Sequence, residues 1–221
     1  MINRELYMEQ ITPFIDKPFV KVITGIRRCG KSVVLRLIRE ELLRRGVSED
    51  HIIYMNFESF EWMDVKEAKA LYTYIREVTK VSGKYYILLD EIQEVTDWEK
   101  AVNAFLVDLD ADIYVTGSNS RLLSSEFSTY LAGRYVAFHI MTLSFREYLL
   151  FHNVPLAISA SDRKAEFLKY LRMGGFPAIH TANYDYNAIY KIVYDIYSSV
   201  ILRDTVQPVS YTHLTLPTIR L

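Results

Sequence analysis

Residues 25–32 read Gly25-Ile26-Arg27-Arg28-Cys29-Gly30-Lys31-Ser32, which is the G-x-x-x-x-G-K-[ST] spacing of a phosphate-binding loop. The two glycines allow the backbone to turn so that successive N–H groups point at anionic oxygens. The lysine can reach the terminal phosphates of a nucleotide, and the serine hydroxyl can ligate Mg²⁺. The structural alternative is a glycine-rich turn that binds nothing, so the flanking residues must decide between the two.

The flanking residues favour phosphate binding. Residues 19–24 (FVKVIT) predict a buried strand that leads into the loop, and residues 32–39 predict a helix that leads out of it. A strand, a loop and a helix in this order place a phosphate at a helix N-terminus. The residues expected to bind the phosphates are Gly25, Ile26, Arg27, Arg28, Cys29, Gly30, Lys31, Ser32 and Val33. We also expect the thiol of Cys29 to be open to thiol reagents but not to act in catalysis.

Composition limits the class of protein. A chain of 221 residues with 50% hydrophobic content can bury a sizeable core and hold one domain plus part of another. The net charge of −1 provides no basic field for nucleic acid. A single cysteine excludes an internal disulfide and fits a reducing cytosol. Because no signal-peptide core and no apolar run of about 18 residues occurs, we expect a soluble cytoplasmic protein with no membrane partner.

The order of the predicted elements indicates an α/β fold. Further strands are predicted over 51–57, 85–89, 113–116 and 135–140, and helices separate most of them. This alternation is typical of βαβ units and a parallel sheet. The patterns T-x-x-E at 96–99 and S-x-x-E at 144–147 are interpreted as capping boxes that start two of the helices.

The pattern changes after about residue 155, where only helices are predicted. Residues 174–177 (GGFP) interrupt them, and an amphipathic stripe then runs from Ile189 to Asp204. Tyrosines interleave with this stripe between residues 184 and 197. They could stack on nucleic-acid bases. Packing against further apolar surface is the favoured interpretation.

Acidic residues follow the strand predicted over 85–89. Asp90 is in the position of a Walker B acid, which holds Mg²⁺ through the water shell of the ion. Glu91 cannot point the same way as Asp90, and it is placed to orient and activate a water against the γ-phosphate. The alternative is that the pair merely caps a helix. Together with the loop at 25–32 that alternative becomes the weaker one. The predicted metal ligands are Ser32 and Asp90.

Two further residues are candidates for catalysis. Asn119 ends a strand expected to lie beside the first strand, where its amide could hold the same water or the γ-phosphate. It suits a helix N-cap equally well. Arg134 lies just before the last strand and cannot readily reach the nucleotide of its own chain. A neighbouring subunit could use it as an arginine finger, although an isolated arginine is more often a plain surface residue.

The last residues resemble a translated sequencing adaptor. Residues 209–218 (VSYTHLTLPT) match the translation of a transposase library adaptor in ten consecutive positions. We therefore expect 208–221 to be non-native and leave them out of the fold prediction. On this interpretation the natural protein continues past Gln207.

With these motifs assembled, the chain resembles the prokaryotic AAA+ ATPases that carry a C-terminal domain of unknown function. The resemblance covers roughly residues 1–207. Its most specific part is 116–120 (TGSNS) with 131–134 (LAGR) and 143–148 (LSFREY), beside the more widespread 23–32 and 88–93 (LLDEIQ). It implies the strand order 5-1-4-3-2, ATP with Mg²⁺, Asn119 as sensor 1, and a homo-oligomer.

The resemblance also sets the expected domains and function. Residues 1–155 form the ATP-binding domain, and 156–207 open a truncated helical C-terminal domain. The function is Mg²⁺-dependent ATP hydrolysis that drives or switches the fused module. The alternative is a slowly hydrolysing nucleotide-dependent switch or scaffold that acts through protein or nucleic-acid contacts. A P-loop kinase is a weaker third interpretation, and nucleic acid remains an open partner.

Overall fold

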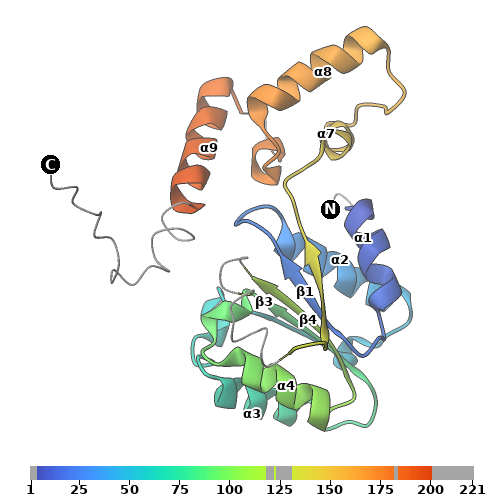
Figure 1. Ribbon diagram of the computed structural model, residues 1–221, viewed down its shortest axis with the longest axis vertical. Helices are drawn as coiled ribbons and strands as arrows, with labels where there is room; N and C mark the ends of the chain where they lie inside the picture. The colour runs from blue at the N-terminus through green and yellow to red at the C-terminus, as the bar shows by residue number, and fades with distance from the viewer. Residues whose placement is uncertain (1–3, 118–121, 123–130, 182–183, 201–221) are drawn as a thin grey trace, which may run out of the picture.

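The computed structural model contains a five-stranded parallel sheet in the order β2-β3-β4-β1-β5 (Figure 1). It describes residues 4–117, 122, 131–181 and 184–200. The strands are β1 (Val20–Thr24), β2 (Ile52–Asn56), β3 (Tyr85–Asp90), β4 (Ala111–Gly117) and β5 (Tyr135–His139). The predicted order 5-1-4-3-2 is confirmed, and the α/β class with it.

Helices cover both faces of the sheet. On one face lie α1 (Glu5–Ile11) and α2 (Lys31–Arg44), and on the other lie α3 (Ala68–Val78) and α4 (Trp98–Asp108), as Figure 1 shows. The alternating side chains of a strand serve the two faces in turn. In β3, for example, Ile87 packs into the α3/α4 core and Leu88 into the α1/α2 core. The sheet is therefore the middle layer of a three-layer domain.

Short 3₁₀ turns complete the connections. They are η1 (Thr12–Phe14), η2 (Glu49–His51), η3 (Phe60–Trp62), η4 (Ile92–Glu94) and η5 (Pro177–His180).

A buried ionic network lies at the N-terminal ends of the strands. Lys21 in β1 forms an ion pair with Asp112 in β4, and the side chains of both are almost completely buried. The ammonium also donates to the carbonyl of Lys17 at 2.8 Å, and Asp112 accepts from the hydroxyl of Tyr114 and the backbone N–H of Asp16, each at 2.8 Å. This network lies at the N-terminal ends of β1 and β4, opposite the carboxyl ends where the glycine-rich loop follows β1.

Past the sheet the described chain is helical, as predicted. It forms α7 (Phe145–Phe151), α8 (Ala160–Met173) and α9 (Tyr186–Val200), which lie beyond the carboxyl ends of the strands in Figure 1. The capping box at Ser144 and Glu147 is confirmed: each side chain bonds the backbone N–H of the other residue.

The capping box predicted at Thr96 is wrong. Helix α4 begins at Trp98 with Asp97 as its N-cap in the left-handed region, at φ 58°. Thr96 instead forms an isolated bridge with Glu67, and its backbone bonds Lys66 and Ala68. The backbone of Thr96 is used to tie two loops together, so this residue cannot cap the helix.

Several expectations lie outside the described residues. These are the interpretation of 208–221 as adaptor-derived, the continuation past Gln207, and the sensor role of Asn119. Within the described part of the chain, no helix is long and apolar enough to cross a membrane.

Acidification is expected to loosen the packing of η5 on α7. His180 is buried, and burial holds the pKa of its imidazole below the usual 6.5. Its Nε2 must carry the proton, because it lies 2.8 Å from the carbonyl oxygen of Gly174. The Nδ1 of neutral His180 then accepts from His152 Nε2 at 3.0 Å. A second proton on His180 would remove this bond.

The sign of the effect follows from the lowered pKa. As pH falls from 6.5 through the folded-state pKa, the unfolded chain binds a proton that the folded chain resists, so stability is lost. The slope is at most about 1.4 kcal/mol per pH unit for one proton. Melting temperatures measured from pH 7.5 to 5 should fall more steeply for the wild type than for His180→Gln. An equal slope in both proteins, with His51→Gln as the control, would contradict this assignment.

Candidate functional site

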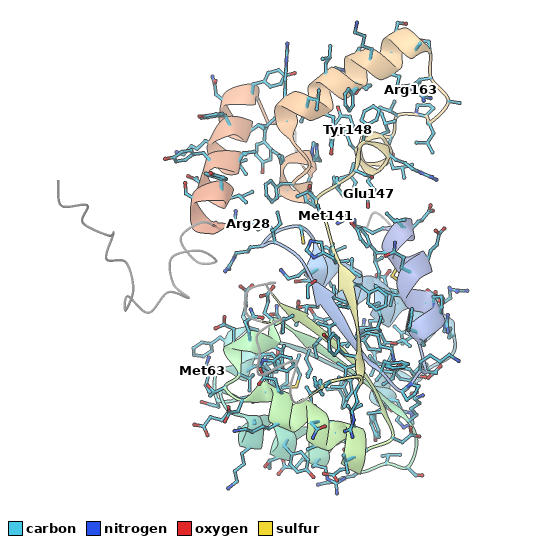
Figure 2. All side chains as sticks on the ribbon, in the orientation of Figure 1. Arg28, Met63, Met141, Glu147, Tyr148 and Arg163 are labelled. Atoms are coloured by element: carbon cyan, nitrogen blue, oxygen red, sulfur yellow. The ribbon has the colours of Figure 1, made fainter. Side chains whose placement is uncertain are left out.

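The loop between β1 and α2 has the backbone that its glycines predict. Gly25 and Gly30 have φ of 154° and 106°, and Gly30 is the N-cap of α2. A Cβ built at Gly25 would lie 2.4 Å from the carbonyl oxygen of Ile140 and 2.7 Å from Cys29 Sγ. Any larger residue would therefore push the loop away from the chain that follows β5. Arg28, at the exposed tip of the loop, is also left-handed at φ 64° (Figure 2).

Lys31 contacts Glu91 across the carboxyl ends of the strands. The ammonium nitrogen lies 3.3 Å from Glu91 Oε1, and the lysine side chain is 3% exposed. Lys31 is the first residue of α2, and Glu91 directly follows β3. Glu91 has φ 54°, a conformation that turns the chain away from the strand direction taken by Asp90. The two motifs predicted separately from the sequence thus meet.

Asp90 is completely buried and its carboxylate has two hydroxyl partners. Thr116 Oγ1 in β4 donates to one oxygen, and Tyr54 OH in β2 donates to the other at 3.1 Å. Thr116 Oγ1 also accepts the backbone N–H of Glu91 at 3.0 Å. Thr116 therefore fixes both acidic residues relative to β4. Burial and the negative charge of Asp90 raise the pKa of the Tyr54 hydroxyl above its usual range.

Gln93 holds the second oxygen of Glu91. Its Nε2 lies 2.5 Å from Glu91 Oε2, and its Oε1 is buried without a hydrogen-bond partner among the described residues. A Cβ built at Gly117 would lie 2.1 Å from this Oε1, so the amide of Gln93 lies against the end of β4.

The residues at these strand ends fit a nucleotide with Mg²⁺. The loop glycines have positive φ, and the N–H groups of Lys31 and Ser32, at the start of the 14-residue helix α2, lack the intrahelical acceptor that Val33 and Val34 find in the Gly30 carbonyl. Lys31 adds a buried cation, and Ser32 and Asp90 add the hard oxygen donors that Mg²⁺ prefers. Phosphate oxygens would offer Lys31 a replacement for the Glu91 carboxylate.

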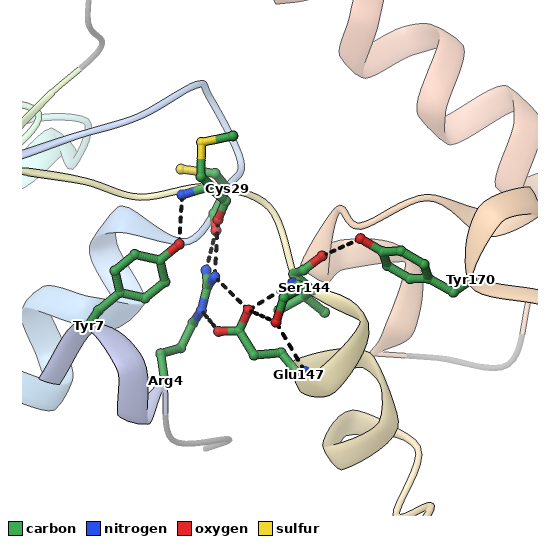
Figure 3. A network of polar contacts seen from close by, with 8 residues as sticks. Arg4, Tyr7, Cys29, Ser144, Glu147 and Tyr170 are labelled. Carbon is green, nitrogen blue, oxygen red and sulfur yellow. Dashed lines mark hydrogen bonds and ion pairs between the residues drawn. The ribbon is translucent and has the colours of Figure 1, made fainter. Parts of the chain in front are cut away.

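Arg4 connects the loop with the helices beyond the sheet (Figure 3). Its buried guanidinium donates to the carbonyl oxygens of Cys29 at 2.8 Å and Met141 at 3.0 Å, and to Glu147 Oε1 at 2.7 Å. Glu147 in turn caps α7 through Ser144. Figure 2 shows Met141 and Glu147 where the chain leaves β5 for the helices. The side chain of Arg4 thus bonds the glycine-rich loop, the segment between β5 and α7, and the first turn of α7.

Arg134 lies at the other end of the sheet from the loop. Its carbonyl accepts from the N–H of Val20, the first residue of β1, whereas the loop follows the last residue of that strand. Its side chain is exposed and donates to Asn103 Oδ1 at 3.1 Å. The predicted arginine finger is therefore not near the loop of its own chain. β4 does lie beside β1, as expected for the strand that precedes Asn119.

Comparison with known proteins places this arrangement in a family. A family model described as an AAA domain matches residues 17–149, which is more than half of the chain. The chain belongs to this AAA domain family. An uncharacterized protein of Haemophilus influenzae is 42% identical over 205 residues, covering 92% of this chain and 50% of that protein. An uncharacterized protein of Methanocaldococcus jannaschii is 34% identical over 212 residues, covering 94% and 45%.

The AAA domain chain spans about half the length of these curated relatives. Among solved structures, the Walker-type ATPase PABY2304 of Pyrococcus abyssi has a TM-score of 0.58 at 13% identity. That match covers 94% of this chain and 75% of the other. At this identity the likeness establishes the shared fold and nothing finer.

One expectation for the AAA domain is not supported by the geometry. The predicted reactivity of Cys29 toward thiol reagents is wrong, because its side chain is 0% exposed and burial raises the pKa of its thiol. A buried neutral thiol is neither reached by a reagent nor ionised to the reactive thiolate. The physical reason is that the side chain of Cys29 packs into the α1/α2 core.

Four residues at the AAA domain site were missed by the sequence analysis. They are Arg4, Tyr54, Gln93 and Thr116. Thr116 could have been found, because a hydroxyl at the end of an apolar strand beside β3 lies level with Asp90. Arg4 gave no signal, because a single arginine near the chain start has no pattern that ties it to a loop 25 residues on.

Proposed function

We propose that the chain binds ATP with Mg²⁺ and hydrolyses it. The observation that carries the proposal is the contact of Lys31 with Glu91, 3.3 Å apart, beside the buried Asp90. A cation for the phosphates, an acid for the metal and a residue that orients the attacking water recur in sites of phosphoryl transfer. Membership of the AAA domain family supports it. So does the fold shared with the Pyrococcus abyssi protein that is named a Walker-type ATPase.

Each group has a distinct role in the proposed reaction. Lys31 and N–H groups within residues 25–33 would bind the phosphates, and Ser32 and Asp90 would hold Mg²⁺, which would neutralise developing charge on the phosphate oxygens. Glu91 takes a proton from the attacking water. We assign Asn119 to hold that water or the γ-phosphate. ATP as the substrate and the single buried thiol both fit a cytoplasmic location.

Lys31→Ala tests whether the loop at 25–32 binds the phosphates of ATP. A charge-assisted bond to phosphate contributes about 1.5–3 kcal/mol, so the dissociation constant of Mg-ATP should rise roughly 10- to 100-fold. Titration calorimetry on the 221-residue chain measures it, with Lys69→Ala on α3 as a matched control on an exposed lysine. Unchanged affinity in Lys31→Ala would place the nucleotide elsewhere, and the proposed function would fall.

Hydrolysis is proposed to drive or switch the helical module that follows the sheet. The support is Arg4, which bonds both the loop carbonyl of Cys29 and Glu147 at the start of α7. We propose residues 1–155 as the ATP-binding domain and 156–207 as the opening of that module. The curated relatives are about twice as long, which leaves room for the remainder of such a module in proteins of this type.

The rival function is a slow nucleotide-dependent switch. The same contact of Arg4 with the loop and α7 favours it, because a switch needs the linkage but not fast chemistry. Single-turnover hydrolysis by the wild type separates the two: bound ATP that persists for hours would favour the switch. Nucleic acid remains a proposed partner without support from the net charge of −1. Binding that weakens with salt would reveal it.

Arg134 is proposed to act on the nucleotide of a neighbouring subunit. It is exposed and lies opposite its own loop, so only another copy could bring it to a γ-phosphate. Because such an arginine contributes about 10³–10⁵ to turnover, Arg134→Ala should be nearly inactive alone. Mixing Arg134→Ala chains with Lys31→Ala chains should restore steady-state turnover in the mixed oligomers. No recovery above the sum of the separate rates would count against a role in trans.

A further inference from the structure

Gln93 is part of the site, yet neither the loop motif nor the acidic pair at 90–91 includes it. Glu91 has two carboxylate oxygens, and each has one partner in this structure. Lys31 lies 3.3 Å from Oε1, and the Nε2 of Gln93 lies 2.5 Å from Oε2. A carboxylate accepts hydrogen bonds and donates none, so the atom of Gln93 that faces it is the amide nitrogen. The amide oxygen consequently points away, toward the end of β4.

These two partners cannot both stay when a nucleotide binds. On the proposed function, Lys31 turns from Glu91 to the phosphates, and Glu91 then loses the contact to Oε1. Gln93 is neutral and belongs to η4, immediately after Glu91, so phosphates do not attract it away. Gln93 therefore stays in place and can hold the carboxylate of Glu91 in one orientation. A base that is free to rotate spends less time aligned with its water, so this contact affects the chemical step.

The amide of Gln93 packs closely against the end of β4. Gly117 is the last residue of β4, and a Cβ there would lie 2.1 Å from Gln93 Oε1. That oxygen is buried and has no partner among the described residues. A buried acceptor without a donor costs free energy, which a water or an N–H group arriving with the ligand would recover. The packing against Gly117 thus confines the oxygen end of the same amide whose nitrogen end contacts Glu91.

We propose that Gln93 is a positioning residue that holds Glu91 in its water-activating orientation once Lys31 has moved to the phosphates. This inference rests on the proposed ATP hydrolysis and adds a residue to it. Gln93 acts through Glu91 and leaves nucleotide affinity to the loop. Its effect should therefore appear in the rate of the chemical step and should require an intact Glu91.

The test is single-turnover ATP hydrolysis by the 221-residue chain and its variants. General-base catalysis contributes about 10²–10⁴, so loss of positioning alone should lower the rate of Gln93→Leu by about tenfold. The dissociation constant of Mg-ATP should stay within about twofold. In the Glu91→Gln background, Gln93→Leu should cost nothing further, because the group it positions has gone. Glu94→Leu, on the same turn but exposed, is the matched control.

Gly117→Ala provides a second route to the same result. A methyl group at this position would lie 2.1 Å from the amide oxygen of Gln93 and 2.8 Å from the side chain of Leu122, so it should displace the amide, and the rate should fall as in Gln93→Leu while nucleotide affinity is retained. A Gln93→Leu rate within twofold of the wild type would overturn the inference. An equal loss of rate when Gln93→Leu is added to Glu91→Gln would also overturn the inference. Weaker ATP binding by Gln93→Leu with an unchanged rate of hydrolysis would do the same. Equal rates for the wild type and Glu91→Gln would remove Glu91 from the mechanism and the inference about Gln93 with it, whereas no hydrolysis by the wild type would refute the proposed function itself.

Discussion

Glu91→Gln is expected to lower the single-turnover rate of ATP hydrolysis by at least about 10²-fold, with Mg-ATP affinity retained. The amide has nearly the shape of the carboxylate but cannot take a proton from water. Glu91 lies beside Lys31, and its backbone N–H is fixed to Thr116 in β4, so the substitution changes a well-anchored group. Rapid-quench measurement with enzyme in excess over ATP reports the chemical step directly.

The effect of Glu91→Gln must be compared with that of the same substitution at an exposed glutamate, and nucleotide binding must be measured separately. Glu77→Gln, on the exposed surface of α3, removes the same charge far from the strand ends and should hydrolyse at the wild-type rate. Calorimetric titration shows whether Glu91→Gln still binds Mg-ATP. An unchanged hydrolysis rate in Glu91→Gln would remove this residue from the mechanism, whatever its place in the fold.

Asp112→Ala is expected to lower the free energy of unfolding by about 3–5 kcal/mol. The substitution leaves the Lys21 ammonium buried, with its side chain 0% exposed and its carboxylate partner gone. Burial already lowers the pKa of Lys21, and Asp112 is the group that favours its charged form. Urea denaturation followed by circular dichroism measures the loss, and Asp64→Ala at an exposed position of the η3 region is the control.

A double variant separates an unpaired charge from lost packing. Lys21→Met with Asp112→Leu removes both charges and keeps apolar volume, so much of the stability lost in Asp112→Ala should return. The remaining deficit comes from Tyr114 and Asp16, which both donate to Asp112 and would lose their acceptor. If Asp112→Ala proves as stable as the wild type, the pair does not hold β1 and β4 together at this edge.

The parts of the fold that follow from local pattern were predictable. The strands are short and mostly apolar, and β3 shows why the prediction succeeds: all six of its residues are buried, and the first five form a continuous apolar run. Asp90 and Glu91 were found because they interrupt that run. The two predicted capping boxes show where prediction from local sequence pattern fails. The same spacing caps α7 at Ser144 but not α4 at Thr96, because a bridge to Glu67 competes for the backbone of Thr96.

Several side-chain contacts in the site could not be predicted. Arg4 and Glu147 are 143 positions apart, and no periodicity in the chain relates them. Gln93 lies two residues from Glu91, yet its side chain contacts Glu91 only because η4 turns the chain back at once. Burial of Cys29 depends on which side of the loop faces the core. The contact of Arg4 depends on how distant parts of the chain pack, and that of Gln93 depends on the turn at η4, so neither is encoded by the loop residues alone.

The most direct test of the nucleotide site is a crystal structure of the chain with Mg²⁺ and a non-hydrolysable ATP analogue. We predict phosphates on the backbone of residues 25–32, the Lys31 ammonium bonded to them and released from Glu91, and Mg²⁺ beside Ser32 and Asp90. A nucleotide bound elsewhere, or bound at the loop with the contact of Lys31 and Glu91 still intact, would contradict this assignment.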